Sequence, residues 1–186
     1  MQTIARKGKL VLKDGSIYEG ELYGKRNAVG EVVFTTGMSG YQETLTDPSF
    51  CGQIVVMTYP LVGNYGTNDL FNQGRKSFFQ GYVISELCDH PSNWRCEKTL
   101  EQFLDEQDVP VLTGVDTRAI TRKLRNYGVL QGVIVPAEMP QEEVEKLLAT
   151  PEVHDQVATV TTPEIYTLGN GKYCLLYTSD AADDLI

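Results

Sequence analysis

Cys51 is the first candidate for chemistry, because a cysteine thiolate is a strong nucleophile and this one lies in a long polar stretch between two apolar segments. A nucleophile elbow needs small residues beside the nucleophile, so that the turn from strand to helix can close. Here Phe50 crowds that turn, and Ser49 is the residue two positions before the thiol. Neither His90 nor His154 lies in a recognisable sequence relation to the cysteine, as an oriented base would. The pattern favours a structural thiol and leaves catalysis by Cys51 as the alternative.

Cys88, His90 and Cys96 are residue types that bind metals, but their spacing matches no common zinc pattern and a fourth ligand is lacking. The two glycine-rich segments, Gly63–Asn68 and Gly169–Lys172, lack the Lys-Ser/Thr pair and the strand-to-helix context of a phosphate-binding loop. We interpret the first as a shaped loop and the second as a hairpin turn. The sequence therefore predicts no metal site and no cofactor.

Three arginines share one face of a predicted helix that follows Asp116. At about 100° per residue, Arg118, Arg122 and Arg125 fall on the same side. The opposite side is formed by Ala119, Ile120, Leu124 and Tyr127. Guanidinium groups bind carboxylates in a bidentate geometry, so the arginine face could dock an acidic partner surface. The alternative is a charged outer face that contacts only solvent.

The overall charge limits the partners of the chain. Its 186 residues include 25 acidic and 16 basic side chains, which give a formal net charge of -9. Such a chain repels nucleic acid and anionic membranes unless a local basic patch overrides the total. No apolar run approaches the ~20 residues of a membrane helix, and the N-terminus lacks the apolar stretch of a secretory signal. We expect a soluble cytoplasmic protein that binds neither nucleic acid nor membrane and keeps its cysteines reduced.

The first half of the chain is rich in predicted β-strands. They cover residues 8–12, 17–23, 31–35 and 53–59. The pair Asp14-Gly15 between the first two is typical of a tight hairpin turn with positive φ angles. The segment from Gly37 to Gly52 joins the last two strands and is predicted to be a loop. It is long for a connector, and long loops on rigid scaffolds often carry function.

Predicted strands and helices alternate in the second half. The strands cover residues 78–87, 109–112 and 129–135. The first helix begins at Thr99 with Gln102 as its capping-box partner, and the second runs from Asp116 to Gly128. A third occupies residues 140–150. The βαβαβ order predicts parallel strands joined by right-handed crossovers, so the fold class is predicted as mixed α/β with a β-rich first half.

The chain divides into a domain at residues 1–150, a polar, turn-rich linker at 151–172 and a new element at 173–186. A strand is predicted at Tyr173–Tyr177, close to the last residue. Read on its residues alone, the chain contains one conspicuous loop and no complete active site. Its residue pattern does not name a reaction.

Three long segments resemble one known family. They are Lys7–Gly20 (KGKLVLKDGSIYEG), Gly30–Asn68, which contains GEVVFTTGMSGYQETLTDP, and Thr113–Gly128 (TGVDTRAITRKLRNYG). They resemble the N-terminal domain of the small, glutamine-hydrolysing subunit of carbamoyl phosphate synthetase. The similarity covers about residues 7–173 in long blocks, which is far more specific than a lone glycine pattern.

The resemblance implies a subunit of a heterodimeric enzyme. In this family the small subunit hydrolyses glutamine, and a large subunit combines the ammonia with bicarbonate and two ATP into carbamoyl phosphate for pyrimidine and arginine synthesis. The catalytic Cys-His-Glu triad belongs to a second domain, a class I glutamine amidotransferase domain. The first domain resembles a swivelling β/β/α three-layer fold, contacts the rest of the complex and supplies one serine to the glutamine site.

By this resemblance that serine is Ser49. Asp47-Pro48 stiffens the backbone before it, because proline fixes its own φ and biases the preceding residue towards extended geometry. The Ser49 hydroxyl could then donate to a carboxylate or accept from an ammonium group. The alternative is a side chain that only caps the local turn. With the resemblance we predict that Ser49 contacts glutamine and that no residue of this chain is catalytic.

The end of the chain departs from the family pattern. From Cys174 it reads CLLYTSDAADDLI, which resembles no part of the family and is typical of translated non-native sequence. We therefore expect residues 173–186 to begin a glutaminase domain that is missing, and the chain to be inactive alone. The alternative is a free-standing protein-interaction module that keeps the fold without the chemistry. An open reading frame with a Gly-x-Cys-x-Gly elbow beyond Ile186 would indicate truncation, and a natural stop codon would favour the module.

Overall fold

The first two strands form the predicted hairpin, with a turn that differs in detail. In the computed structural model, which describes residues 5–150, 155–165 and 171, β1 (Arg6–Leu12) and β2 (Ile17–Tyr23) pair antiparallel. Gly15 has a positive φ of 87°, whereas Asp14 does not, so the expected pair of positive φ angles is wrong. Asp14 Oδ1 instead accepts a hydrogen bond from Ser16 N at 3.0 Å. The turn thus uses backbone hydrogen bonds from Leu12 N to Ser16 O and from Gly15 N to Leu12 O, the Asp14 side chain and one left-handed glycine.

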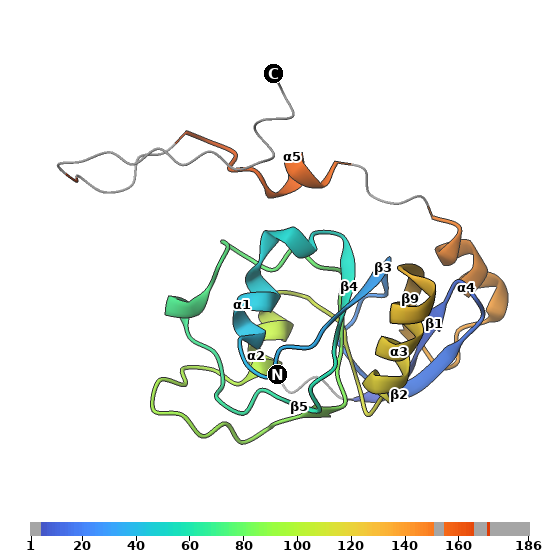
Figure 1. Ribbon diagram of the computed structural model, residues 1–186, viewed down its shortest axis with the longest axis horizontal. Helices are drawn as coiled ribbons and strands as arrows, with labels where there is room; N and C mark the ends of the chain where they lie inside the picture. Colours follow the sequence, from blue (N-terminus) through green and yellow to red (C-terminus); the bar gives the residue numbers. More distant parts are fainter. Residues whose placement is uncertain (1–4, 151–154, 166–170, 172–186) are drawn as a thin grey trace.

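Seven strands of the described chain close into a barrel (Figure 1). After β1 and β2 these are β3 (Ala28–Thr35), β4 (Gln53–Met57), β6 (Gly81–Val83), β8 (Val111–Thr113) and β9 (Leu130–Pro136). Their order is β1-β2-β8-β6-β4-β3-β9, and β9 closes the barrel by pairing with β1 and β3. A separate two-stranded sheet is formed by β5 (Leu61–Val62) and β7 (Glu86–Leu87).

The parallel crossover predicted for the second half occurs once. β6 and β8 run parallel, with α2 (Leu100–Glu106) between them in the chain. After α3 (Thr117–Tyr127), however, β9 runs antiparallel to both of its neighbours, so the third parallel strand expected from the alternating pattern is wrong. The physical reason is that β2 already pairs with the other edge of β8, so β9 pairs instead with the edges of β1 and β3, which would otherwise be unpaired. The fold is mixed α/β, as predicted.

The segment from Gly37 to Gly52 contains regular structure, so the prediction of a loop was wrong. It holds α1 (Tyr41–Thr46) and a turn of 3₁₀-helix, η1 (Pro48–Phe50). No side chain within the segment caps α1. Its first N–H groups, those of Gly40 and Tyr41, instead donate to the Tyr65 hydroxyl at 2.8 and 3.1 Å. Because this cap is far away in the sequence, no local pattern indicates the helix.

The helices α2 and α3 and the third predicted helix begin where the sequence predicts. Thr99 and Gln102 form the capping box of α2, with both hydrogen bonds present. Asp116 caps α3 by accepting from Ala119 N at 2.9 Å. Gly128 ends that helix with a φ of 84°. The third predicted helix is α4 (Gln141–Leu148).

The hydrophobic core has three parts. Because side chains alternate along a strand, one set points into the barrel; it comprises Leu10, Leu12, Leu22, Ala28, Val32, Ile54, Val56, Val83, Leu112 and Ile134. Ile120 and Leu124 of α3 and Val115 before it extend this cluster. A second cluster packs α1 and α2 against the outer side chains of β4, β6 and β8. The third packs Val144 of α4 against Val11, Val133 and Val135. The helices therefore cover separate outer faces and one end of the barrel.

One residue of the predicted apolar face of α3 is not buried. Ile120 and Leu124 pack into the core as expected, but the Tyr127 side chain is 76% exposed. Tyr127 is the last residue of α3, beyond the part of the helix that contacts the barrel. Lys123 Nζ lies 5.8 Å from the centre of its ring.

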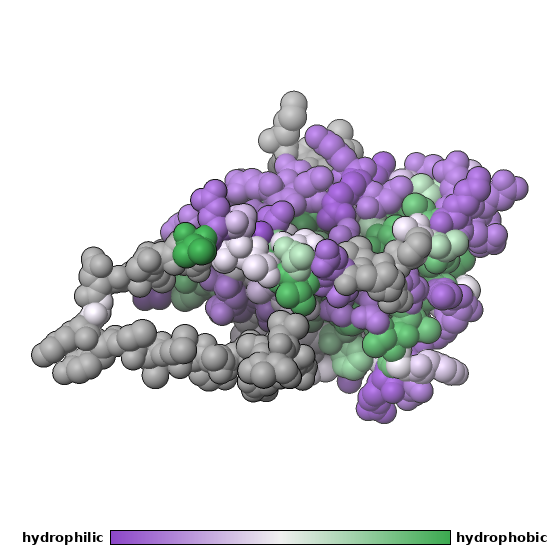
Figure 2. All heavy atoms as spheres, turned by 90° about the horizontal axis from the view of Figure 1, so that it is seen from above, coloured by the Kyte–Doolittle hydropathy of each residue, from purple (hydrophilic) through white to green (hydrophobic). Residues whose placement is uncertain are grey.

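The predicted linker region contains a short helix, α5 (Gln156–Val160). Seen from the side on which α5 lies, the surface is largely hydrophilic with separate hydrophobic areas (Figure 2). No described helix has the length and hydropathy needed to cross a membrane. The predicted strand at Tyr173–Tyr177 lies outside the described residues, and the domain and linker boundaries stay predictions.

Candidate functional site

Ser49 lies on η1, between α1 and β4. Asp47 precedes it with φ −71° and ψ 117°, the extended geometry that a following proline favours. Asp47 Oδ1 accepts a hydrogen bond from Ser49 N at 2.8 Å. The local turn is therefore capped by the aspartate, with the serine backbone as donor. The Ser49 side chain is exposed, and its hydroxyl forms no hydrogen bond to the described residues, so it is available to a ligand.

A groove of about 390 Å³ opens beside Ser49. On the barrel side it is lined by Glu31, Pro48, Ser49, Cys51 and Gln53, and on the other side by Gln156, Val157 and Val160 of α5. Gln53 Nε2, on the first residue of β4, donates to Glu31 Oε2 in the middle of β3 at 2.9 Å. The described lining thus combines one hydroxyl, one carboxylate and the two amides of Gln53 and Gln156 with apolar side chains.

Arg75 connects α5 to the barrel. Its Nη1 donates to Thr161 O and its Nη2 to Thr159 O, both at 3.3 Å. These are carbonyl groups at the C-terminal end of the short helix, which a guanidinium group satisfies well. The guanidinium carbon also lies 5.3 Å from the centre of the Phe78 ring. Arg75 therefore helps to hold α5 over the groove.

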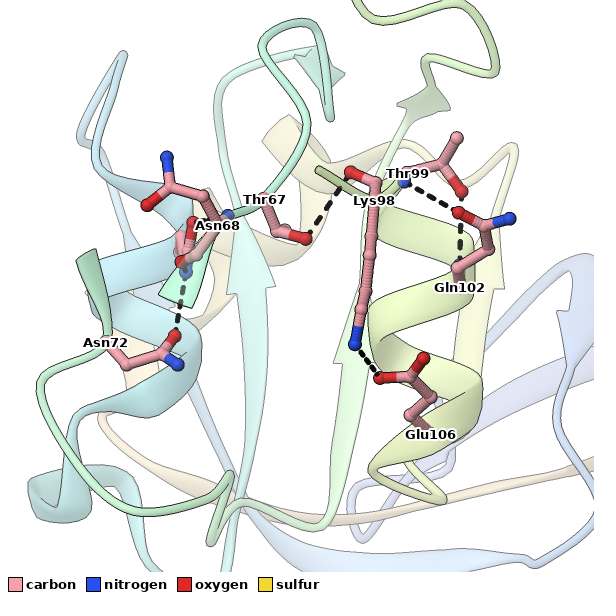
Figure 3. A network of polar contacts seen from close by, with 8 residues as sticks. Thr67, Asn68, Asn72, Lys98, Thr99, Gln102 and Glu106 are labelled. Carbon is pink, nitrogen blue, oxygen red and sulfur yellow. Dashed lines mark hydrogen bonds and ion pairs between the residues drawn. The ribbon is translucent and has the colours of Figure 1, made fainter. Parts of the chain in front are cut away.

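A polar network positions α1 and the turn that follows it. Gln42 is buried; its amide donates to Asn68 O and, at 2.7 Å, to Asn72 Oδ1, and it accepts from Asn68 N at 3.1 Å. The buried Thr46 hydroxyl accepts from Gln73 N at 2.9 Å. Figure 3 shows Asn68 and Asn72 against α1, with Thr67 reaching towards Lys98 at the start of α2. The network ties the segment before η1 to the loop between β5 and β6.

Sequence reasoning missed Glu31, Gln42, Gln53 and Arg75. Glu31 and Gln53 are the first residues of two predicted strands. Polar residues at the ends of two strands could have indicated a contact between them. Gln42 and Arg75 gave no such signal, because the partners of each lie far away in the sequence.

The sequence between residues 10 and 134 matches the family model described as "Carbamoyl-phosphate synthase small chain, CPSase domain". The chain belongs to this family. Ser49, the groove residues of the barrel and the arginine face of α3 all lie within the matched part. The resemblance that the sequence motifs indicate is therefore confirmed.

Individual relatives agree with the family match. The chain is 54% identical over 140 residues to the carbamoyl phosphate synthase small chain of Caldanaerobacter subterraneus subsp. tengcongensis, covering 75% of this chain and 39% of the relative. It is 46% identical over 173 residues to the pyrimidine-specific small chain of Halalkalibacterium halodurans, covering 91% and 48%. The small chain of Bacillus caldolyticus is 47% identical over the same length, with 91% and 48% covered. The chain spans about half the length of the relatives it matches, or less.

Cys51 borders the groove without the properties of an activated nucleophile. Its side chain is buried, and burial raises the pKa of the thiol, although the nearby Lys76 opposes that rise. Nucleophilic cysteines have lowered pKa values instead, because the thiolate is the reactive form. A structural role for Cys51 stays the favoured prediction.

The candidate metal ligands do not form a cluster. Within the described residues, no three His, Cys, Asp or Glu side chains are arranged to hold a metal. His90 has a side chain that is 94% exposed, and Cys96 Sγ donates to Lys98 O at 3.4 Å.

The Gly63–Asn68 segment has the strongly bent backbone of a shaped loop. Gly63 and Gly66 have φ values of 98° and 67°. A Cβ atom at Gly66 would lie 2.2 Å from Cys96 Sγ, so only glycine fits. Most of the predicted Gly169–Lys172 hairpin turn lies outside the described residues.

The arginine face of α3 is exposed. Arg118, Arg122 and Arg125 all face solvent, and none of them forms a salt bridge within the described part of the chain. Arg118 also borders a second groove of about 600 Å³ at the start of α3, whose lining includes the hydroxyl-bearing residues Thr36, Thr58 and Ser85. This exposure fits both a docking surface and a charged face that contacts only solvent, so the docking role stays a prediction.

Proposed function

We propose that this chain is the N-terminal domain of the glutaminase subunit of a glutamine-dependent carbamoyl phosphate synthase, with a role in glutamine binding and subunit contact but not in the bond-breaking steps. Family membership supports the subunit assignment. Two relatives named pyrimidine-specific support a role in pyrimidine synthesis, and arginine synthesis is the other use of the product. In this proposal the protein acts in the cytoplasm as part of a heterodimer with a large subunit.

The Ser49 hydroxyl is the single observation that carries the proposal. It is exposed at a groove, on a turn whose backbone is held by Asp47. A hydroxyl held on a rigid turn can donate to a substrate carboxylate while losing little conformational entropy. α5 borders the same groove, so a domain that follows α5 in the chain would meet Ser49 there.

The reaction then divides between domains. A glutaminase domain with a Cys-His-Glu triad breaks the amide bond of glutamine, and the large subunit combines the ammonia with bicarbonate and two ATP. This domain orients glutamine through Ser49 and presents Arg118, Arg122 and Arg125 to acidic groups of the large subunit or of the glutaminase domain. The barrel, with helices on separate faces, is the part that we assign to the swivelling β/β/α three-layer fold of the family.

The test is a Ser49→Ala substitution in the full-length small chain, assayed with its large chain. Loss of one neutral hydrogen bond, about 1 kcal/mol, should raise the KM for glutamine roughly fivefold. The kcat should change much less, because Ser49 takes no part in bond breaking. Glutamine-dependent ammonia release is the measurement.

Ser92→Ala is the matched control, because Ser92 is also exposed but lies outside the groove. It should leave KM unchanged. If Ser49→Ala also leaves KM unchanged and lowers thermal stability instead, Ser49 is a turn residue. That result would overturn the proposed role of this domain in glutamine binding.

A further inference from the structure

Glu31 is the one charged side chain among the eight described residues that line the groove at Ser49. The others are polar or apolar, namely Pro48, Ser49, Cys51, Gln53, Gln156, Val157 and Val160. A carboxylate in the wall of a groove favours a cationic group of a ligand, because bulk water screens the attraction less there. The cations Arg75 and Lys76 lie nearby but are not among the described lining residues. The groove therefore has a defined charge preference.

The Glu31 carboxylate is held in place by its neighbours. Glu31 and Gln53 lie opposite each other on the parallel strands β3 and β4. These strands approach closely, since a Cβ atom at Gly30 would lie 2.3 Å from Gly52 O. Gln53 Nε2 binds Glu31 Oε2 at 2.9 Å, and Oε1 has no hydrogen bond to the described residues. One carboxylate oxygen is thus used for orientation, and the other is available.

The groove offers two complementary groups to an α-amino acid. An amino acid carries an ammonium group and a carboxylate on one carbon atom, and each needs a partner when it leaves water. Glu31 supplies a carboxylate for the ammonium group, and the Ser49 hydroxyl supplies a donor for the carboxylate. The volume of about 390 Å³ falls within the ~300–1,000 Å³ typical of small-molecule sites.

We propose that Glu31 binds the α-ammonium group of the amino acid held by Ser49 and makes the site selective for substrates that carry this group. The inference rests on the proposed function, because it concerns the same site. Gln53 is a positioning residue that orients the carboxylate. α5 forms one wall of the groove and so limits the access of water from that side.

The experiment compares two substrates on the full-length small chain with its large chain. Glutamine carries the α-ammonium group, and glutaramate is the same amide acid without it. Glu31→Gln should raise the KM for glutamine about 10- to 100-fold, the effect of losing a hydrogen bond to a charged group, with little change in kcat. The KM for glutaramate should be the same in Glu31→Gln and in wild type. The variant should therefore lose the preference of the wild type for glutamine.

Two control variants separate charge from structure. Glu31→Asp keeps the charge and should retain part of the preference for glutamine over glutaramate. Glu19→Gln removes an exposed carboxylate from β2, outside the groove, and should change neither KM. An equal rise in KM for both substrates with Glu31→Gln would mean that Glu31 only supports the fold, which overturns the inference.

The outcomes also separate this inference from the proposed function. If Ser49→Ala raises the KM for glutamine while Glu31→Gln leaves the preference for glutamine unchanged, Glu31 is not the ammonium partner and the proposed function stands. If neither variant changes the KM for glutamine, the proposed function fails together with the inference.

Discussion

The helices α1 and α3 are held in place in different ways. α3 is capped by its own N-terminal aspartate, Asp116, and ends at a left-handed glycine, Gly128. α1 begins at Gly40 without a side-chain cap from its own segment, and the Tyr65 hydroxyl accepts its first N–H groups. The buried Gln42 then binds the Asn68–Asn72 segment. α3 is thus encoded locally, and α1 depends on distant partners.

The difference matters because Ser49 follows α1 almost directly. Whatever displaces α1 also displaces the turn of Asp47 and Ser49, and hence one wall of the groove. The candidate site is therefore placed by the part of the fold with the fewest local signals. Because distant polar partners hold α1 in place, the removal of a single partner should lower the stability of the fold.

The largest effect is expected from Gln42→Met, which keeps the length of the side chain and removes its hydrogen bonds. Asn68 N, Asn68 O and Asn72 Oδ1 would each lose a partner. Unsatisfied buried groups cost about 1–3 kcal/mol each, with some relief from water, so we expect a loss of about 3 kcal/mol in the free energy of unfolding. Urea denaturation of the chain is the measurement.

Gln141→Met is the matched control for this variant. Gln141 lies on α4, and its amide donates to Glu145 Oε1 at 3.0 Å on an exposed surface. It should change the free energy of unfolding by less than about 0.5 kcal/mol. A loss below about 1 kcal/mol for Gln42→Met would contradict the dependence of α1 on its distant partners.

The two caps can be compared directly with Tyr65→Phe and Asp116→Ala. Tyr65→Phe should keep the stack on Tyr41, whose ring centre lies 4.1 Å away, but it removes the acceptor of two N–H groups. We expect a loss of about 2 kcal/mol. Asp116→Ala removes one N-cap acceptor and should cost about 1 kcal/mol.

Urea denaturation again gives the free energies, and hydrogen exchange at the Gly40 and Tyr41 amides gives a local readout. These amides should exchange faster in Tyr65→Phe and remain unchanged in Asp116→Ala. Tyr127→Phe is the control, because that hydroxyl lies on an exposed side chain. The comparison fails if Tyr65→Phe costs no more than Asp116→Ala.

The same contrast explains how much the sequence could predict. The capping box at Thr99, the cap at Asp116 and the stop at Gly128 are local chemical signals, and the structure has all three. α1 was missed because its cap is Tyr65, and the direction of β9 was missed because it depends on which strand edges remain unpaired. Within the candidate site, Ser49 was predicted through the family resemblance. The contact between Glu31 and Gln53 was not predicted, because it depends on the register in which β3 and β4 pair.

α3 has one long-range polar contact of its own, which joins it to the β1–β2 hairpin. Lys123 Nζ lies 2.5 Å from Asp14 Oδ2 and also binds the Ser16 hydroxyl. The hydrogen bond from Lys123 is the main reason that the pKa of Asp14 is lowered, and the same contact raises the pKa of Lys123. If α3 is encoded locally, the removal of this contact should matter little.

The smallest effect is therefore expected from Asp14→Asn, which removes the charge and keeps the acceptor for Ser16 N. Because folding lowers the pKa of Asp14, the ion pair stabilises the fold above the unfolded pKa of about 3.9 and loses this contribution as the pH falls through the lower, folded value. At the alkaline end, the contribution is lost only as the pH rises through the raised pKa of Lys123.

Urea denaturation at about pH 7 should give a slightly larger free energy of unfolding for wild type than for Asp14→Asn. The loss should be smaller than for Asp116→Ala, because both partners of the ion pair contact solvent and salt screens them. The difference should shrink below about pH 4. A difference at neutral pH as large as that of Gln42→Met would mean that α3, like α1, depends on a distant partner, and the contrast between the two helices would no longer hold.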